Sequence, residues 1–94
     1  MDGAPTVVHR SEASRFEAEV GGRIAICAYR RSGDRLDLVH TEVPAAAQGR
    51  GIAAQLVRET LDWARREGLH VRPLCSYVAA YMQRHPETQD LLVR

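Results

Sequence analysis

The sequence predicts an α/β (α+β) fold with a mixed, mostly antiparallel sheet, a long amphipathic helix and a second helix near the C-terminus. Three successive segments alternate apolar with polar residues and are joined by short turns at Gly21-Gly22 and at Ser32-Gly33-Asp34, which is typical of an antiparallel meander. After them, apolar residues recur at helical spacing from Ile52 to Ala64. With 94 residues, we expect one domain, residues 1–94, with a modest core.

The strands are expected mainly in the first half of the chain. A loose end over 1–5 precedes a short strand over 6–9, and the alternation over 15–20 indicates a half-buried strand. Residues 23–31 carry apolar side chains on both faces, so we expect a central strand that meets apolar surroundings on both sides. A longer strand covers 36–43. Simple alternation on that strand places four side chains on one face: Leu36, Leu38, His40 and Glu42.

Two helices and one further strand are expected in the second half. The first helix covers about four turns and ends at Gly68, a residue typical of helix C-termini. A crossover then leads to a short strand within 69–74, which is therefore parallel to the strand before the helix, and Pro73 stops its pairing. A second helix begins at the N-cap Ser76 and ends before His85-Pro86, and a last turn packs back on the sheet.

The stretch 48–53 joins a strand to the first turn of the long helix. The N–H groups of that turn have no partners inside the helix, and they form a positive end that can bind phosphate oxygens. Gly49 and Gly51 have no Cβ, so a ligand can approach the main chain, and Arg50 adds a positive charge. A tight turn without a ligand is the alternative. A P-loop is excluded because the chain has no lysine, and the dinucleotide fingerprint is disfavoured because the strands ahead of this loop look like antiparallel hairpins and not like a parallel unit.

The same stretch matches the acyl-CoA loop of the Gcn5-related N-acetyltransferases (GNAT), which has the pattern Gln/Arg-x-x-Gly-x-Gly/Ala. The match to Gln48-Gly49-Arg50-Gly51-Ile52-Ala53 is complete in residue type and spacing. The phrases His40-Thr41-Glu42-Val43-Pro44, Cys75-Ser76-Tyr77-Val78 and His85-Pro86-Glu87 resemble a very small, single-domain branch of that superfamily. The resemblance covers most of the chain, and it implies the GNAT fold with acetyl-CoA as the acyl donor.

The resemblance also implies roles for individual residues. Main-chain groups around Glu42 and Val43 would bond the pantetheine amides or the thioester oxygen, in a wedge where two parallel strands splay apart. His85 would approach the cofactor from the end of the second helix; the alternative is a residue favoured there by the helix dipole. The residues implied for the pyrophosphate are Gln48, Gly49, Arg50, Gly51, Ile52 and Ala53.

The chain departs from full-length relatives in its first half. Those relatives carry two helices between their first two strands, which help to wall the acceptor site, and nothing comparable fits here. We therefore expect the first two GNAT helices to be absent. The acceptor must then be held by a partner, by an open groove, or not at all.

Three side chains compete for the chemistry of acetyl transfer. Tyr81 stands where the family pattern Tyr-x-x-x-Gly places its acid, although His85 replaces the glycine; packing on a helix is the alternative. Cys75 lies at a helix N-terminus, which favours thiolate, and would act as a nucleophile or contact the CoA sulfur; a buried small hydrophobe is the alternative. His40 with Glu42 would serve as base and orienting carboxylate, unless both are ordinary surface residues.

Composition excludes several classes of function. The formal net charge of +1 and the interspersed charges argue against a nucleic-acid partner. Cys27 reads as core, and neither it nor Cys75 shows a paired spacing, so a reduced, cytoplasmic setting is expected. No apolar run is long enough to span a membrane, and the four histidines show no metal-ligand spacing. We expect a monomer or a weak dimer.

The leading interpretation is an acetyl-CoA-binding N-acetyltransferase. Its acceptor would be an amine on a small molecule, a protein or a peptide. The alternative from another class is a non-catalytic CoA-binding or protein-interaction module on the same fold, because the acceptor walls are missing. A third interpretation is a β-meander and helix domain that binds no ligand.

Overall fold

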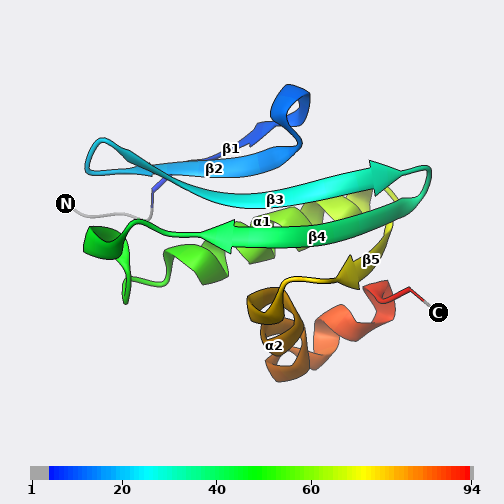
Figure 1. Cartoon of the computed structure of the whole chain (residues 1–94). Helices are drawn as coiled ribbons and strands as arrows, with labels where there is room; N and C mark the ends of the chain where they lie inside the picture. Colours follow the sequence, from blue (N-terminus) through cyan, green and yellow to red (C-terminus); the bar gives the residue numbers. More distant parts are fainter. Residues whose placement is uncertain (1–4, 94) are drawn as a thin grey trace.

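A computed structural model of the chain describes residues 5–93 and contains one five-stranded sheet in the order β1-β2-β3-β4-β5 (Figure 1). Each of the pairs β1–β2, β2–β3 and β3–β4 is antiparallel, and β5 is parallel to β4. This is the mixed, mostly antiparallel sheet that the sequence predicts. The strands are β1 (Val7–Arg10), β2 (Arg15–Val20), β3 (Arg23–Ser32), β4 (Arg35–Glu42) and β5 (His70–Pro73). The loose end expected over 1–5 lies, apart from Pro5, outside the described residues.

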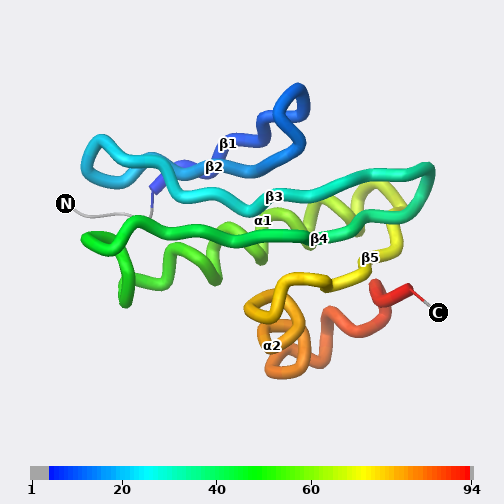
Figure 2. The backbone as a smooth tube through the Cα atoms, viewed as in Figure 1, coloured from blue at the N-terminus to red at the C-terminus, as the bar shows by residue number. Residues whose placement is uncertain are grey.

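Two α-helices follow the meander at the predicted positions, α1 (Ile52–Arg66) and α2 (Ser76–Arg84), but the predicted N-cap of α2 is wrong, because Cys75 is the N-cap and Ser76 is the first helical residue. In Figure 2 the tube of α1 runs behind β3 and β4, while α2 lies beyond β5. Short 3-10 turns occupy Ser11–Ala13, Ala45–Ala47 and Pro86–Leu91. Between β1 and β2 the chain makes only the first of these turns, so the two early GNAT helices are absent from this connection, as expected.

The core lies between α1 and one face of the sheet. Phe16, Ala18 and Cys27 point from the strands toward α1, and Leu56 and Val57 meet them from the helix. All five side chains are buried, and burial of large apolar side chains of this kind contributes roughly 1.5–3 kcal/mol each. This layer is the main source of the sheet's stability.

The opposite face of the sheet is not covered as the sequence analysis expects. Ala25, Cys27 and Tyr29 of β3 are buried against the helix side, but Ile24 on the other face is 45% exposed. β3 is the central strand, as predicted, but its second face meets apolar surroundings only in part, because Ile26 and Ala28 are half-buried and Ile24 is exposed. Alternating apolar residues show which side chains can be buried, whereas coverage depends on which elements follow later in the chain.

A β-bulge in β4 also overturns the predicted alternation. Ala28 of β3 pairs with His40, but the next residue, Tyr29, pairs with Leu38, so Val39 is an extra residue on β4. One extra residue turns every following side chain to the other face. Leu38 is consequently buried toward α1. His40 is exposed on the opposite face of the sheet, which α1 does not cover and which we call the helix-free face. The prediction that the two share a face is wrong.

The last part of the chain packs along β5. Val71 of β5 forms an isolated parallel bridge with Leu92, and the Val93 N–H donates to the Val71 carbonyl at 2.9 Å. Thr88 and Leu91 of the last turn are buried. The prediction that this turn packs back on the sheet is confirmed. Within residues 5–93, no helix is both long enough and apolar enough to cross a membrane.

Candidate functional site

The predicted acyl-CoA loop is exposed and lies directly before α1. Gly49 and Gly51 have φ angles of 80° and 76°, a left-handed conformation that residues with a Cβ rarely adopt. Gln48 and Arg50 are exposed beside them, and no side chain caps the helix at Gly51. The N–H groups of the first helical turn, residues 52–54, therefore have no partner within the helix. Such a terminus is chemically suited to an anion.

The Gln48 side chain shapes this loop. Its amide Nε2 donates a hydrogen bond to the Val43 carbonyl at 3.1 Å, which ties the loop to the residue after β4. Ile52 is buried and Ala53 is half-buried, so both anchor the first turn of α1. The residues predicted to bind pyrophosphate are thus brought together, with Gln48 and Ile52 in positions that hold the others.

Two open clefts meet at the start of α1. The first, which we call the loop cleft, has a volume of about 460 Å³ and lies between the loop, the end of β4 and Tyr77 of α2. The second, the interhelix groove, has a volume of about 960 Å³ and separates α1 from α2 and the last turn. Gly51 and Ala54 line both clefts. Together they form a bent surface that passes around the exposed helix N-terminus.

The interhelix groove is basic where it meets the loop and is closed by ion pairs at its other end. Arg50 of the loop and Arg58 of α1 line this end of the groove. At the other end, both guanidinium NH groups of Arg65 bind the Asp90 carboxylate, at 2.6 and 3.0 Å, and one of them also donates to the Glu87 carbonyl at 3.0 Å. This contact fastens the last turn of the chain to α1.

β4 and β5 separate beside the loop cleft. Their pairing runs from Arg35 with His70 to Leu38 with Pro73, and the Leu38 carbonyl then accepts both the Leu74 and the Cys75 N–H groups. Beyond this point β4 continues to Glu42, paired only with β3. The prediction that pairing stops at Pro73 is confirmed. One edge of β4 over 39–42 is left without a strand partner, which is where a polar chain could bind.

Cys75 lies at this separation, as the N-cap of α2. Its Sγ is 3.5 Å from the Thr41 hydroxyl. Partial burial acts to raise the pKa of the Cys75 thiol, but hydrogen bonds from the Thr41 hydroxyl and from the backbone N–H groups of Val78 and Tyr77 outweigh it, so the pKa is lowered. The arrangement favours thiolate. By contrast, Cys27 is fully buried and burial raises its pKa, which fits its interpretation as a core residue.

Tyr81 and His85 form a stacked pair in the interhelix groove. Their ring centroids are 3.9 Å apart with an interplanar angle of 14°, and the His85 Nδ1 lies 2.7 Å from the Tyr81 carbonyl. Because a carbonyl only accepts, Nδ1 carries the proton. Tyr81 is buried, which raises its pKa. Both residues line the interhelix groove and not the loop cleft.

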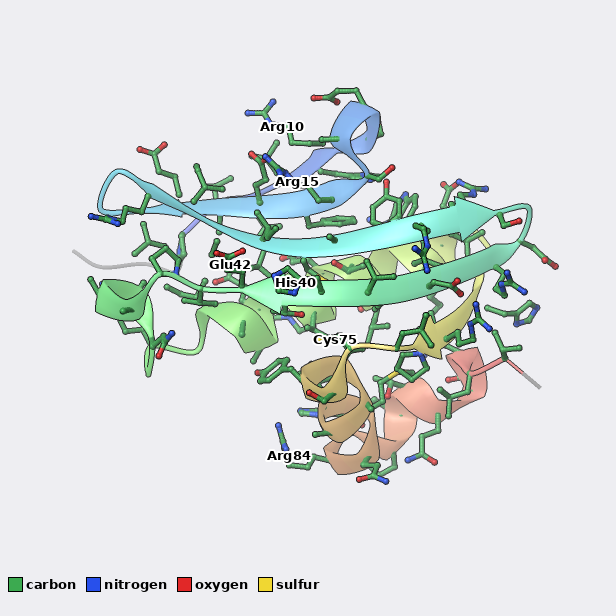
Figure 3. All side chains as sticks on the ribbon, in the orientation of Figure 1. Arg10, Arg15, His40, Glu42, Cys75 and Arg84 are labelled. Atoms are coloured by element: carbon green, nitrogen blue, oxygen red, sulfur yellow. The ribbon has the colours of Figure 1, made fainter. Side chains whose placement is uncertain are left out.

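His40 and Glu42 lie on the helix-free side of β4. The His40 Nε2 is 3.3 Å from a Glu42 carboxylate oxygen, and both side chains are exposed. Figure 3 shows the pair on β4 with Cys75 across the strand separation, at the start of α2. The side chain of Thr41, between them in sequence, contacts Cys75 on the other side of the strand. The predicted acid–base and thiol candidates therefore approach the open edge of β4 from opposite sides.

Sequence analysis missed two residues of the loop cleft. Thr41 and Tyr77 line it, and both contribute to the hydrogen bonding of Cys75. Tyr77 is four residues before Tyr81 on α2, one helical turn nearer the loop, so helical spacing from Tyr81 could have identified it. Thr41 could not be identified from the sequence, because its position beside Cys75 depends on the bulge in β4. Residues 5–93 contain no group of three or more His, Cys, Asp or Glu placed to hold a metal ion.

The chain is similar to known proteins in sequence and in fold. Human and mouse protein NATD1 are 41% and 36% identical to it over 88 residues, which cover 90% of this chain and 78% and 80% of theirs. In fold, it resembles a GCN5-like protein of Staphylococcus aureus solved by NMR, with a TM-score of 0.70, 18% identity and coverage of 98% and 91% of the two chains.

A family model described as GCN5-related N-acetyl-transferase matches residues 15–91, a range that contains β2 to β5, the loop and both helices. The exposed glycine loop, the separated parallel strands and this match agree with one another. The chain therefore belongs to the GCN5-related N-acetyltransferase family.

Proposed function

We propose that this protein binds acetyl-CoA and transfers the acetyl group to an amine. The observation that carries the proposal is the continuity of the loop cleft and the interhelix groove at Gly51 and Ala54, beside the unpaired edge of β4. A long ligand with an anionic middle and a thioester end matches this course. Family membership supports the same chemistry.

Each part of the donor has chemically suitable partners along this surface. The diphosphate would accept hydrogen bonds from the N–H groups of residues 52–54, with Arg50 beside them. The amides of the pantetheine arm would pair with the free edge of β4 around Glu42 and Val43. The nucleotide end would lie in the interhelix groove near Arg58 and His85. Gln48 would position the loop through its bond to the Val43 carbonyl.

In direct transfer, a neutral amine attacks the thioester carbon, the new C–N bond forms, and the C–S bond breaks. The amine must lose a proton, and His40 is the nearest histidine in sequence to the proposed thioester position. Its Nε2 faces the Glu42 carboxylate at 3.3 Å, which fits an orienting contact that leaves Nδ1 free to accept the proton. The departing CoA thiolate gains a proton from water or from a nearby hydroxyl.

Cys75 offers a second route with the same overall balance. Its thiolate, favoured by the Thr41 and helix N–H contacts, would attack the thioester, release CoA and carry the acetyl group until the amine arrives. Intact-mass measurement after incubation with acetyl-CoA distinguishes the routes. A gain of one acetyl group that is absent in Cys75→Ser supports the covalent route, and unchanged turnover in Cys75→Ala rejects it.

Acetyl-CoA binding is tested by two matched glycine substitutions. Gly51→Ala and Gly33→Ala both place a Cβ at a positive φ, 76° and 62°, with no atom within 4 Å, so each should cost about 1 kcal/mol of stability. Only the Gly51 Cβ would occupy the space of the diphosphate. Acetyl-CoA should therefore raise the melting temperature of the wild type and of Gly33→Ala, and much less that of Gly51→Ala. No rise for the wild type at millimolar acetyl-CoA would refute the proposal.

A non-catalytic CoA-binding module is the second candidate. It is favoured by the open acceptor side, where a single 3-10 turn, Ser11–Ala13, joins β1 to β2, and by the packing of Tyr81 against His85. Release of CoA thiol in the presence of an amine panel separates the two candidates. Turnover that His40→Gln reduces without changing acetyl-CoA binding supports the enzyme, whereas binding without turnover supports the module.

A further inference from the structure

The helix-free face of the sheet carries three rows of side chains, each running across several strands. Residues that pair directly across antiparallel or parallel strands lie on the same face, so the register defines the rows. The first row is Val8, Glu17, Ile26 and Glu42; the second is Arg10, Arg15, Ala28 and His40; the third is Arg30, Asp37 and Arg72. The second row ends at the proposed base, His40.

Guanidinium groups outnumber carboxylates around the second and third rows. Arg10 and Arg15 share a single carboxylate, that of Glu17, at 3.4 and 2.6 Å. In the third row the Asp37 carboxylate accepts two hydrogen bonds from Arg72, at 3.0 and 2.7 Å. Arg30 is exposed and makes no hydrogen bond or ion pair with any side chain between residues 5 and 93. A positive excess therefore remains on this face.

Ala28 lies at the centre of this charge. It pairs directly with Arg15 on one side and with His40 on the other, and Arg30 is two residues further along β3. Neighbouring strands are about 4.8 Å apart and alternate residues about 7 Å apart, so all three polar side chains border the small Ala28 methyl group. Glu42 lies on the other side of His40. The Glu42 carboxylate therefore lies on one side of His40, and the guanidinium groups that border Ala28 lie on the other.

We propose that the acetyl acceptor is a small amine that also carries an anionic group, a carboxylate or a phosphate. This inference rests on the proposed transfer function. The amine nitrogen lies at His40 and Glu42, and the anionic group lies over Ala28 between Arg15 and Arg30. The amine forms its C–N bond as the thioester C–S bond breaks, and its proton passes to His40. Arg30, which makes no hydrogen bond to a carboxylate within residues 5–93, is the main anion ligand.

The test uses two pairs of acceptors that differ only in the anionic group. The pairs are β-alanine with β-alaninamide, and 3-aminopropyl phosphate with 3-aminopropanol. Release of CoA thiol is measured for each, and rates are compared at equal concentrations of neutral amine. We expect kcat/KM to be about tenfold higher for the anionic member of at least one pair, because charge-assisted hydrogen bonds to guanidinium are of that order. The pair that shows the preference identifies carboxylate or phosphate.

The variant Arg30→Gln should lower kcat/KM for the anionic member of the preferred pair toward the value of its neutral partner. Arg30→Lys should restore part of this preference. The matched control is Arg23→Gln, an exposed arginine at the start of the same strand whose side chain is on the α1 side of the register; it should keep the full preference. The shift in melting temperature produced by acetyl-CoA should be the same in all three variants, which shows that they are folded and bind the donor.

Equal kcat/KM values within both pairs would overturn the inference while leaving acetyl transfer intact. If no amine is acetylated, the transfer function fails, and the charge argument is then decided by NMR. Amide shifts of Ala28 and His40 that move with 3-aminopropyl phosphate but not with 3-aminopropanol, and not in Arg30→Gln, support an anion site on this face. Shifts that are the same for both compounds overturn it.

Discussion

The two faces of the sheet are built from the same strands but have opposite characters. Toward α1, Phe16 and Cys27 are buried in an apolar layer. On the other face, Glu17 and Asp37 are surrounded by arginines, and Ile24 is exposed. The α1 face holds the fold together, whereas the helix-free face carries no apolar layer and is the face on which we propose that the acceptor binds. The proposed site lies where the two faces meet, at the open edge of β4.

The difference predicts a large loss of stability from a change on the α1 face. Leu56→Ala removes a fully buried side chain of α1 and leaves a cavity against the sheet. We expect a loss of about 2–5 kcal/mol in the free energy of unfolding, measured by urea titration. A loss below about 1 kcal/mol would show that α1 is only loosely packed on this face.

The two faces should also respond to acid in different pH ranges. His9 is on the α1 face, its ring stacked on Phe16 at 4.2 Å and its Nε2 2.6 Å from the Tyr29 hydroxyl. Burial, which outweighs the attraction of Glu12 and Glu67, lowers the pKa of His9 below 6.5. The unfolded chain therefore binds this proton first, so the stabilisation is complete above pH 6.5 and declines as the pH falls below it.

His9→Gln should make stability less sensitive to pH between about 7 and 5, as followed by urea unfolding at a series of pH values. On the helix-free face, the Arg72 hydrogen bonds lower the pKa of Asp37 below 3.8, so its contribution is present above that value and is lost only in stronger acid. If the free energy of unfolding depends on pH equally in wild type and in His9→Gln near neutrality, the change in this pH range does not come from His9 on the α1 face.

A smaller effect is expected at the edge where the faces meet. Thr41→Val removes the hydroxyl 3.5 Å from the Cys75 sulfur. The pKa of Cys75 should rise toward its ordinary value, and the rate of alkylation by iodoacetamide at neutral pH should fall several-fold. Thr6→Val, at an exposed site, is the control. An unchanged rate would mean that the N–H groups of α2 are sufficient to keep the pKa of Cys75 lowered.

The smallest effect is expected on the helix-free face. Ile24→Thr replaces an apolar side chain that is 45% exposed, and exposed substitutions away from special features change stability by about 0.5 kcal/mol or less. Urea unfolding beside Leu56→Ala measures the contrast directly. If Ile24→Thr costs as much as the core substitution, an apolar partner must cover this face in solution.

Local sequence patterns were sufficient for most elements and for the loop. The spacing of Leu56, Val57 and Leu61 predicts α1, and the Gly49–Gly51 pair marks the exposed loop before it. The bulge was not predictable, because Val39 and its neighbours have ordinary strand propensity and the extra residue is visible only in the pairing with β3. For that reason simple alternation places His40 on the same face as Leu38, which is wrong, and does not reveal the contact between Thr41 and Cys75.

The clasp between Arg65 and Asp90 has a practical consequence for handling this protein. It ties one wall of the interhelix groove to the last few residues of the chain, so the width of that groove depends on a segment remote from the glycine loop. Deletion of the segment from Pro86 to Val93 would therefore alter this groove and, at the same time, remove the pairing of Leu92 and Val93 with β5. Measurements of the proposed donor affinity are best made with this segment unaltered.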